Sequence, residues 1–276
     1  MTTFTESFQP ETGCLSLALF LTAILYGVSL LLIGLYFLSP ARPNDSVFVK
    51  CTVAFLSILG TAEMLCLFVG IEIKMLNPST PNQVFALPLG EMVFMVSLMA
   101  LVAQLFFATR IWIVSNSSWH YVGPITLLAF IQFAVALAQI IIQHKLAGIN
   151  LFHSSVALVA SQTSTTAAAD ILITVGLCRT LQSSRSGIGR TDVVVAKLIR
   201  YSIHRGAATS VAAVLTVLFV TTMPSTALMV PLLVSGQLYV ISVVSMLLNR
   251  SKLRDLLHGN NSNNIPSATI SSRSAA

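Results

Sequence analysis

Residues 15–38 read LSLALFLTAILYGVSLLLIGLYFL, a run of 24 residues without a single charged side chain. An α-helix needs roughly 20 predominantly apolar residues to cross the hydrocarbon core of a bilayer. This run is therefore long enough to span a membrane. Because backbone groups find no water partner inside lipid, such a segment is expected to be a helix rather than an open strand.

The rest of the chain follows the same pattern. Of its 276 residues, 55% are hydrophobic and 9% are charged, whereas soluble proteins carry roughly 25% charged residues. We therefore expect an all-α membrane protein, a bundle of seven transmembrane helices. The expected spans are 15–38, 47–72, 87–114, 121–143, 153–178, 203–222 and 225–248. The sixth is the weakest, because its uncharged part is short.

The distribution of Lys and Arg predicts the orientation, since positive residues collect in cytoplasmic loops. Of the 15 Lys and Arg, 13 lie in the tail, in the connections after the first, third and fifth stretches, or at the ends of stretches that adjoin these connections. We therefore expect residues 1–14 to be extracellular, 15–248 to form the membrane domain, and 249–276 to be a cytoplasmic, disordered tail. The net charge of +6 is then explained by topology and anionic lipids, and nucleic acid is not expected as a partner.

Asp170 stands inside the fifth stretch, in TTAAADILITVGL at 165–177. A charged residue at the centre of a membrane helix costs roughly 2.5–3.5 kcal/mol on insertion scales. Such a residue therefore normally faces the bundle or pairs with another group. Gln162, Thr166 and Asp170 recur at every fourth position, which predicts one polar stripe on the inner face of this helix.

Other stretches also carry polar residues, which predicts a shared polar cavity or ligand site. The candidate residues of this cavity are Asp170, Glu63, Gln104, Gln139, Gln162, Thr166 and Tyr239. The alternative is plain hydrogen bonding between helices, worth on average about 0.6 kcal/mol per bond.

The segment VVVAKLIRYSIHRG at 193–206 leads into the sixth stretch. Its basic residues recur at helical spacing on one face, which predicts a surface for a cytoplasmic partner. The alternative is contact with lipid headgroups. The candidate residues of this basic face are Arg110, Arg190, Lys197, Arg200, His204 and Arg205.

The segments AAADILITVGLCRTLQSSRSGIGRTDVVVAKLIRYSIHRG (167–206) and LYVISVVSMLLNRSKLR (238–254) carry a resemblance. They resemble a multi-pass fungal family, abundant in mushroom-forming basidiomycetes, that is catalogued only as a domain of unknown function. The resemblance is most specific over 168–254 and implies the seven-helix fold and its topology, but no activity. The matching positions are Asp170, Leu181, Arg185, Gly187, Arg190, Thr191, Asp192, Gly206, Thr209, Tyr239, Ser242, Asn249 and Arg254.

Two classes of function remain. The seventh stretch holds no lysine that could bind retinal, and the five histidines do not cluster in the sequence as a metal or hydrolase site would require. No enzymatic activity, metal or cofactor is therefore expected. The first class is a receptor-like sensor of a small or lipophilic ligand, signalling through its cytoplasmic face in the plasma membrane or an endomembrane. The second is a transporter or proton-coupled carrier using Asp170 and Glu63.

Overall fold

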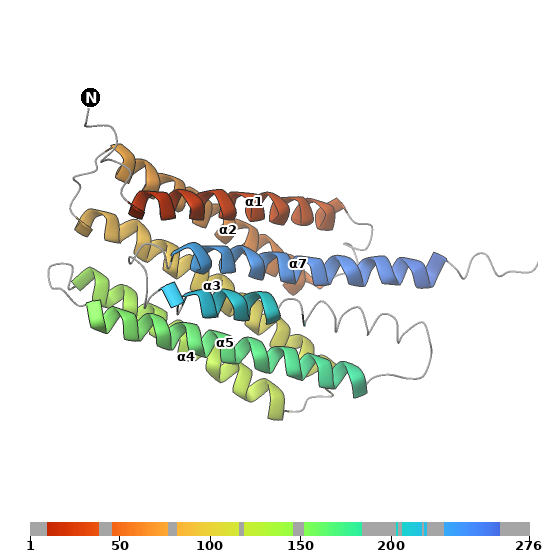
Figure 1. The fold of residues 1–276 in the computed structure, drawn as a ribbon. Coiled ribbons are helices and arrows are strands. Elements are labelled where there is room, and N and C mark those ends of the chain that lie inside the picture. Colours follow the sequence, from red (N-terminus) through yellow and green to blue (C-terminus); the bar gives the residue numbers. More distant parts are fainter. Residues whose placement is uncertain are drawn as a thin grey trace, which may run out of the picture.

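The computed structural model describes residues 10–38, 46–76, 82–115, 119–145, 152–183, 203, 206–216, 218–219 and 229–259. This part of the chain is all-helical, as predicted, and its long helices run side by side (Figure 1). The long helices are α1 (Pro10–Leu38), α2 (Val47–Leu76), α3 (Asn82–Val114), α4 (Trp119–Lys145), α5 (Phe152–Ser183) and α7 (Met229–Gly259). A shorter helix, Gly206–Thr216, lies between α5 and α7 in the sequence.

Five helices contain segments long and apolar enough to cross a membrane, so the chain is a multi-pass membrane protein that requires a lipid bilayer. These segments are Gly13–Leu38, Val47–Ile73, Gly90–Ile113, Val122–Ile142 and Val230–Leu248. Each lies within a few residues of a predicted span at both ends, except the last, which begins five residues later than predicted.

Two predicted spans are not among these five. α5 has 32 residues and is long enough, but its described residues do not form one of the five apolar segments. The Gly206–Thr216 helix is too short by itself. Seven spans and an extracellular N-terminus therefore stay predictions.

α3 is the central helix of the bundle and contacts α2, α4, α5 and α7. In a strongly apolar 18-residue part of α3, 67% of the residues are buried, against 22% in the corresponding part of α1. α1 packs on α2 and α7 and leaves large apolar side chains such as Phe20 and Leu31 exposed. In a bilayer these side chains contact lipid.

α7 is the second helix of the interior, since it contacts α1, α2 and α3. Its side chains at Leu233, Val240 and Val243 are buried. The helix continues to Gly259, beyond the predicted end of the seventh span. Because neighbours surround α7, its polar residues face partners on more than one side.

Candidate functional site: a polar cavity beside α7

Asp170 and Tyr239 form a buried pair between α5 and α7. The exposed fraction of each side chain is 1%. The Tyr239 hydroxyl donates a hydrogen bond of 2.7 Å to Oδ2 of Asp170. Burying a carboxyl group is unfavourable unless hydrogen bonds replace its water, and this bond supplies one of them. The prediction that Asp170 faces the bundle interior is confirmed.

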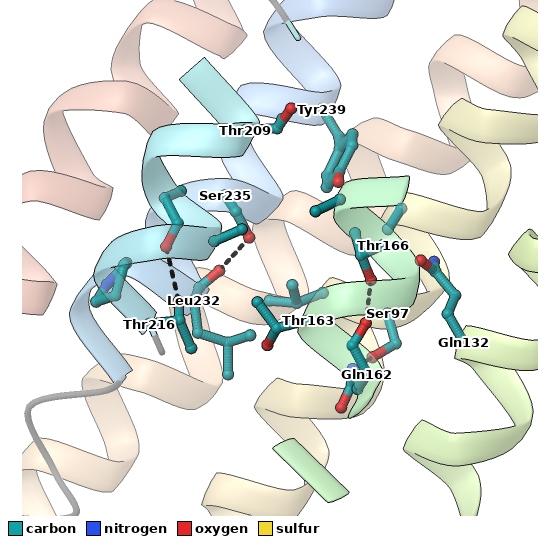
Figure 2. A pocket seen from close by; sticks show the side chains of 16 residues that line it. Ser97, Gln132, Gln162, Thr163, Thr166, Thr209, Thr216, Leu232, Ser235 and Tyr239 are labelled. Carbon is teal, nitrogen blue, oxygen red and sulfur yellow. Dashed lines mark hydrogen bonds between the residues drawn. The ribbon is translucent and has the colours of Figure 1, made fainter. Parts of the chain in front are cut away.

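A cavity of about 40 Å³ adjoins this pair, with room for about three water molecules. Figure 2 shows side chains from α3, α4, α5, α7 and the Gly206–Thr216 helix around it. The lining residues are Val96, Ser97, Ala100, Gln132, Gln162, Thr163, Thr166, Ala167, Thr209, Ala212, Ala213, Thr216, Pro231, Leu232, Ser235 and Tyr239.

Small side chains create this space. Ala100 of α3, Ala167 of α5 and the pair Ala212 and Ala213 line the cavity. Protein interiors are close-packed, so opposed alanines leave a void where larger side chains would interdigitate. The cavity lies near the midpoints of α3, α4 and α5 and in the N-terminal third of α7.

The structure brings part of the predicted polar set together here. Gln162, Thr166 and Tyr239 line the cavity. The Gln162 amide donates to the Ser97 hydroxyl at 2.9 Å. Gln104 does not line the cavity, but its amide nitrogen donates a hydrogen bond of 3.2 Å to Oε1 of the lining residue Gln132. Asp170 does not line the cavity either, but it is hydrogen-bonded to the lining residue Tyr239.

Glu63 lies elsewhere, between α2 and α7, although we predicted one shared cavity. It accepts a hydrogen bond of 2.8 Å from Nε2 of Gln237, which also lies 3.4 Å from the carbonyl oxygen of Gly60. Ser29 of α1 donates to Oε1 of Gln237 at 3.2 Å. We call Ser29, Gly60, Glu63 and Gln237 the α2-side cluster.

This cluster is tightly packed. A Cβ atom on Gly236 would lie 3.0 Å from Oε1 of Glu63 and 2.9 Å from Cε of Met99. Within the described part of the chain, Oε1 of Glu63 has no hydrogen-bond partner. Gln139 of α4 is also buried outside the cavity lining, and its Oε1 likewise has no partner among the described residues.

Gln237 is the residue that sequence reasoning missed. It is fully buried and joins α7 to both α1 and α2. The predicted α7 residue, Tyr239, lies two positions further along the helix and therefore on a different face from Gln237. Its signal was available, since a glutamine inside the apolar run VPLLVSGQLYVIS at 230–242 requires a buried partner.

Among the residues of the predicted basic face, the structure describes Arg110 alone. Arg110, near the C-terminal end of α3, is half-buried, and its guanidinium lies 5.1 Å from the centroid of the Phe106 ring. The remaining residues of that face lie outside the described part of the chain: Arg190, Lys197, Arg200, His204 and Arg205.

Comparison with known families gives one finding. A family model described as a family of unknown function (DUF6534) matches residues 166–252. This region contains Asp170, the Gly206–Thr216 helix and Tyr239, and it agrees with the predicted segment 168–254. The predicted resemblance to a family of unknown function is confirmed there, while a fungal origin stays a prediction. Neither the curated proteins nor the solved structures contain a match to this chain.

Proposed function

We propose that this protein is a receptor-like membrane sensor whose small or lipophilic ligand binds in the polar cavity. The observation that carries the proposal is the cavity itself, which five helices line at mid-depth of the bundle. Ligand sites in helix bundles combine apolar walls with a few well-placed polar groups. Gln132, Gln162 and Tyr239 supply such groups here. No catalytic role is proposed for them.

The Gly206–Thr216 helix offers a route from the cavity to the cytoplasmic side. Thr209 and Ala212 of this helix line the cavity. At its first residue, a Cβ atom on Gly206 would overlap the hydroxyl oxygen of Thr174 in α5. A ligand that shifts this helix against α5 would change that close contact. The signal would then be a population shift between two helix packings, passed to the predicted basic face just before Gly206.

The alternative is a transporter or proton-coupled carrier that uses Asp170 and Glu63. It is supported by the burial of both carboxyl groups inside the bundle. The sensor is favoured because the two groups contact different faces of α7, and only Asp170 adjoins the cavity. A carrier that used both would need a polar path linking them.

A conformational reporter tests the sensor. Gln182, exposed near the C-terminal end of α5, would be replaced by cysteine and labelled with an environment-sensitive fluorophore in nanodiscs. A panel of neutral alcohols, ethers, ketones and esters of up to about eight heavy atoms supplies the probes, a size at which small ligands bind efficiently per atom. We expect at least one probe to change the fluorescence saturably.

A matched pair of variants shows whether the cavity is responsible. Ala212→Phe fills it, whereas Val211→Phe places the same ring on the exposed side of the same helix. Only Ala212→Phe should abolish the response. Protein-dependent uptake of a probe into proteoliposomes, without any fluorescence change, would instead favour the carrier.

The proposal also requires the predicted orientation. An epitope tag on the C-terminal tail should be inaccessible from outside intact cells, and the sequon at Asn116 should carry no glycan. A glycan there or an exposed tail would remove the basic face from the cytoplasm and contradict signalling to a cytoplasmic partner.

A further inference from the structure

The lining of the cavity is electrically neutral over the residues that the structure describes. Its sixteen residues include hydroxyl and amide side chains but no Lys, Arg, His, Asp or Glu. An ionised ligand would lose its hydration there without a charged partner in the lining, which is strongly unfavourable. The neighbouring Asp170 is not among the lining residues and accepts a hydrogen bond from Tyr239. The lining therefore favours a neutral ligand.

Most hydroxyl groups of the lining already donate their hydrogen to other protein atoms. Seven lining residues carry a hydroxyl, and six of these donate their hydrogen to another protein atom. Five donate to a backbone carbonyl of their own helix: Ser97 to Val93, Thr166 to Gln162, Thr209 to Gly206, Thr216 to Ala212 and Ser235 to Leu232. The sixth, Tyr239, donates to Asp170.

A hydroxyl whose hydrogen is already used still has oxygen lone pairs that accept. In the described lining, these acceptor oxygens outnumber the groups that can still donate, which are the Thr163 hydroxyl and the amide groups of Gln132 and Gln162. Gln162 uses one amide hydrogen for Ser97 and keeps the other, and its carbonyl oxygen can only accept. A bound molecule therefore gains most by bringing a donor. A ligand with acceptors alone would face these oxygens without a hydrogen to share.

We propose that the cavity binds the hydroxyl end of a small neutral alcohol, with oxygens such as those of Thr166, Ser235 and Tyr239 as acceptors. This inference rests on the proposed function, since it names the ligand class of the same site. Val96, Pro231 and Leu232 line the cavity as well and contact the alkyl part. A cavity of about 40 Å³ holds a short alkyl alcohol or the head of a longer one.

Photolabelling of the full chain in nanodiscs tests this inference. The probes are a short alkyl alcohol that carries a diazirine and the methyl ether of the same compound. Adducts are mapped by peptide mass spectrometry. One lost hydrogen bond is worth about 1 kcal/mol, so we expect the alcohol to label cavity residues of α5 and α7 about five-fold more than the ether does. Labelling of lipid-facing residues such as Phe20 should be equal.

Competition uses the isomers 1-butanol and diethyl ether, with butylamine as a charged probe. 1-Butanol should suppress the cavity adducts more than its isomer does. Ala212→Phe should remove them and Val211→Phe should retain them. Equal labelling by alcohol and ether would overturn the ligand class while leaving the cavity as a binding site, and stronger competition by butylamine would overturn its neutral character. Absence of cavity adducts from every probe would overturn both this inference and the proposed function.

Discussion

On two faces of α7 a side chain donates a hydrogen bond to a buried carboxyl group, but the surroundings of the two pairs are packed differently. On the α2 side, Gln237 donates to the buried carboxyl group of Glu63 at 2.8 Å. On the α5 side, Tyr239 donates to the buried carboxyl group of Asp170 at 2.7 Å. The α2-side cluster has Gly236 and Met99 packed against it, whereas Tyr239 lines a cavity.

This difference separates a structural role from a binding role. A polar cluster in a close-packed region has no room to change partners and therefore holds its helices in one arrangement. A similar pair next to open space can respond to whatever enters that space. We therefore propose a stabilising role for the α2-side cluster and a ligand-binding role for the cavity that Tyr239 lines.

Gln237→Leu should have the largest effect on stability. It removes the donor to Glu63 and the contacts with Gly60 and Ser29, and so leaves a buried carboxyl group without its partner. The expected loss in the free energy of unfolding is about 3 kcal/mol, measured by denaturation in detergent micelles. The exposed Gln182→Leu is the control. A Gln237→Leu protein as stable as the native one would show that the α2-side cluster does not stabilise the bundle.

Gly236→Val should cost about 2 kcal/mol of stability through overpacking. Its Cβ atom would approach Met99, Glu63 and Val96 within 2.9–3.2 Å. The matched control is Gly34→Val in α1, where a Cβ atom meets nothing within 4 Å. Equal stability of the two variants would contradict the tight packing assigned to the α2 side.

Gly206→Ala should cost about 1.5 kcal/mol, because its methyl group would collide with the Thr174 hydroxyl. Thr174→Ala removes the colliding atoms, so the double variant should recover at least half of the lost stability. A double-mutant cycle in the same denaturation assay gives the coupling between the two sites. If the effects of Gly206→Ala and Thr174→Ala on stability are additive, the two residues are not in close contact.

Tyr239→Phe should have the smallest effect on stability, about 1 kcal/mol for one hydrogen bond, yet it should weaken photolabelling of the cavity by the alcohol. Tyr26→Phe is the matched control, since its hydroxyl bonds Thr61 between α1 and α2 at 3.0 Å. It should cost similar stability and leave the labelling unchanged. If both variants label alike, the hydroxyl of Tyr239 does not contact the ligand.

The helices could be predicted well from the sequence, because the length and apolar character of a run are local properties. Gly13–Leu38 and Gly90–Ile113 lie close to the predicted spans 15–38 and 87–114. The polar stripe of α5 correctly predicted the burial of Gln162 and Asp170, because spacing along one helix defines which side chains share a face.

The pairing between helices could not be predicted in the same way. A stripe does not say which neighbour it faces, so the sequence predicts one cavity for Glu63 and Asp170, whereas the two groups bond to residues on different faces of α7. The cavity depends on where Ala100, Ala167 and Ala212 meet, and that is a property of the assembled bundle. Gln237 was missed because α7 is enclosed by α1, α2 and α3 and has more than one buried face.

The difference between an open α5 side and a packed α2 side is tested most directly by comparing Ser235 of α7 with Ser29 of α1. Ser235 lines the cavity, and Ser29 bonds Gln237 in the α2-side cluster. Each would be changed to cysteine in a chain whose four native cysteines, all unpaired, are replaced by alanine. Reaction with the small neutral reagent methyl methanethiosulfonate would then be timed in nanodiscs. We expect Ser235→Cys to react readily and Ser29→Cys to stay unreacted. Equal rates, or faster reaction at Ser29→Cys, would contradict this difference.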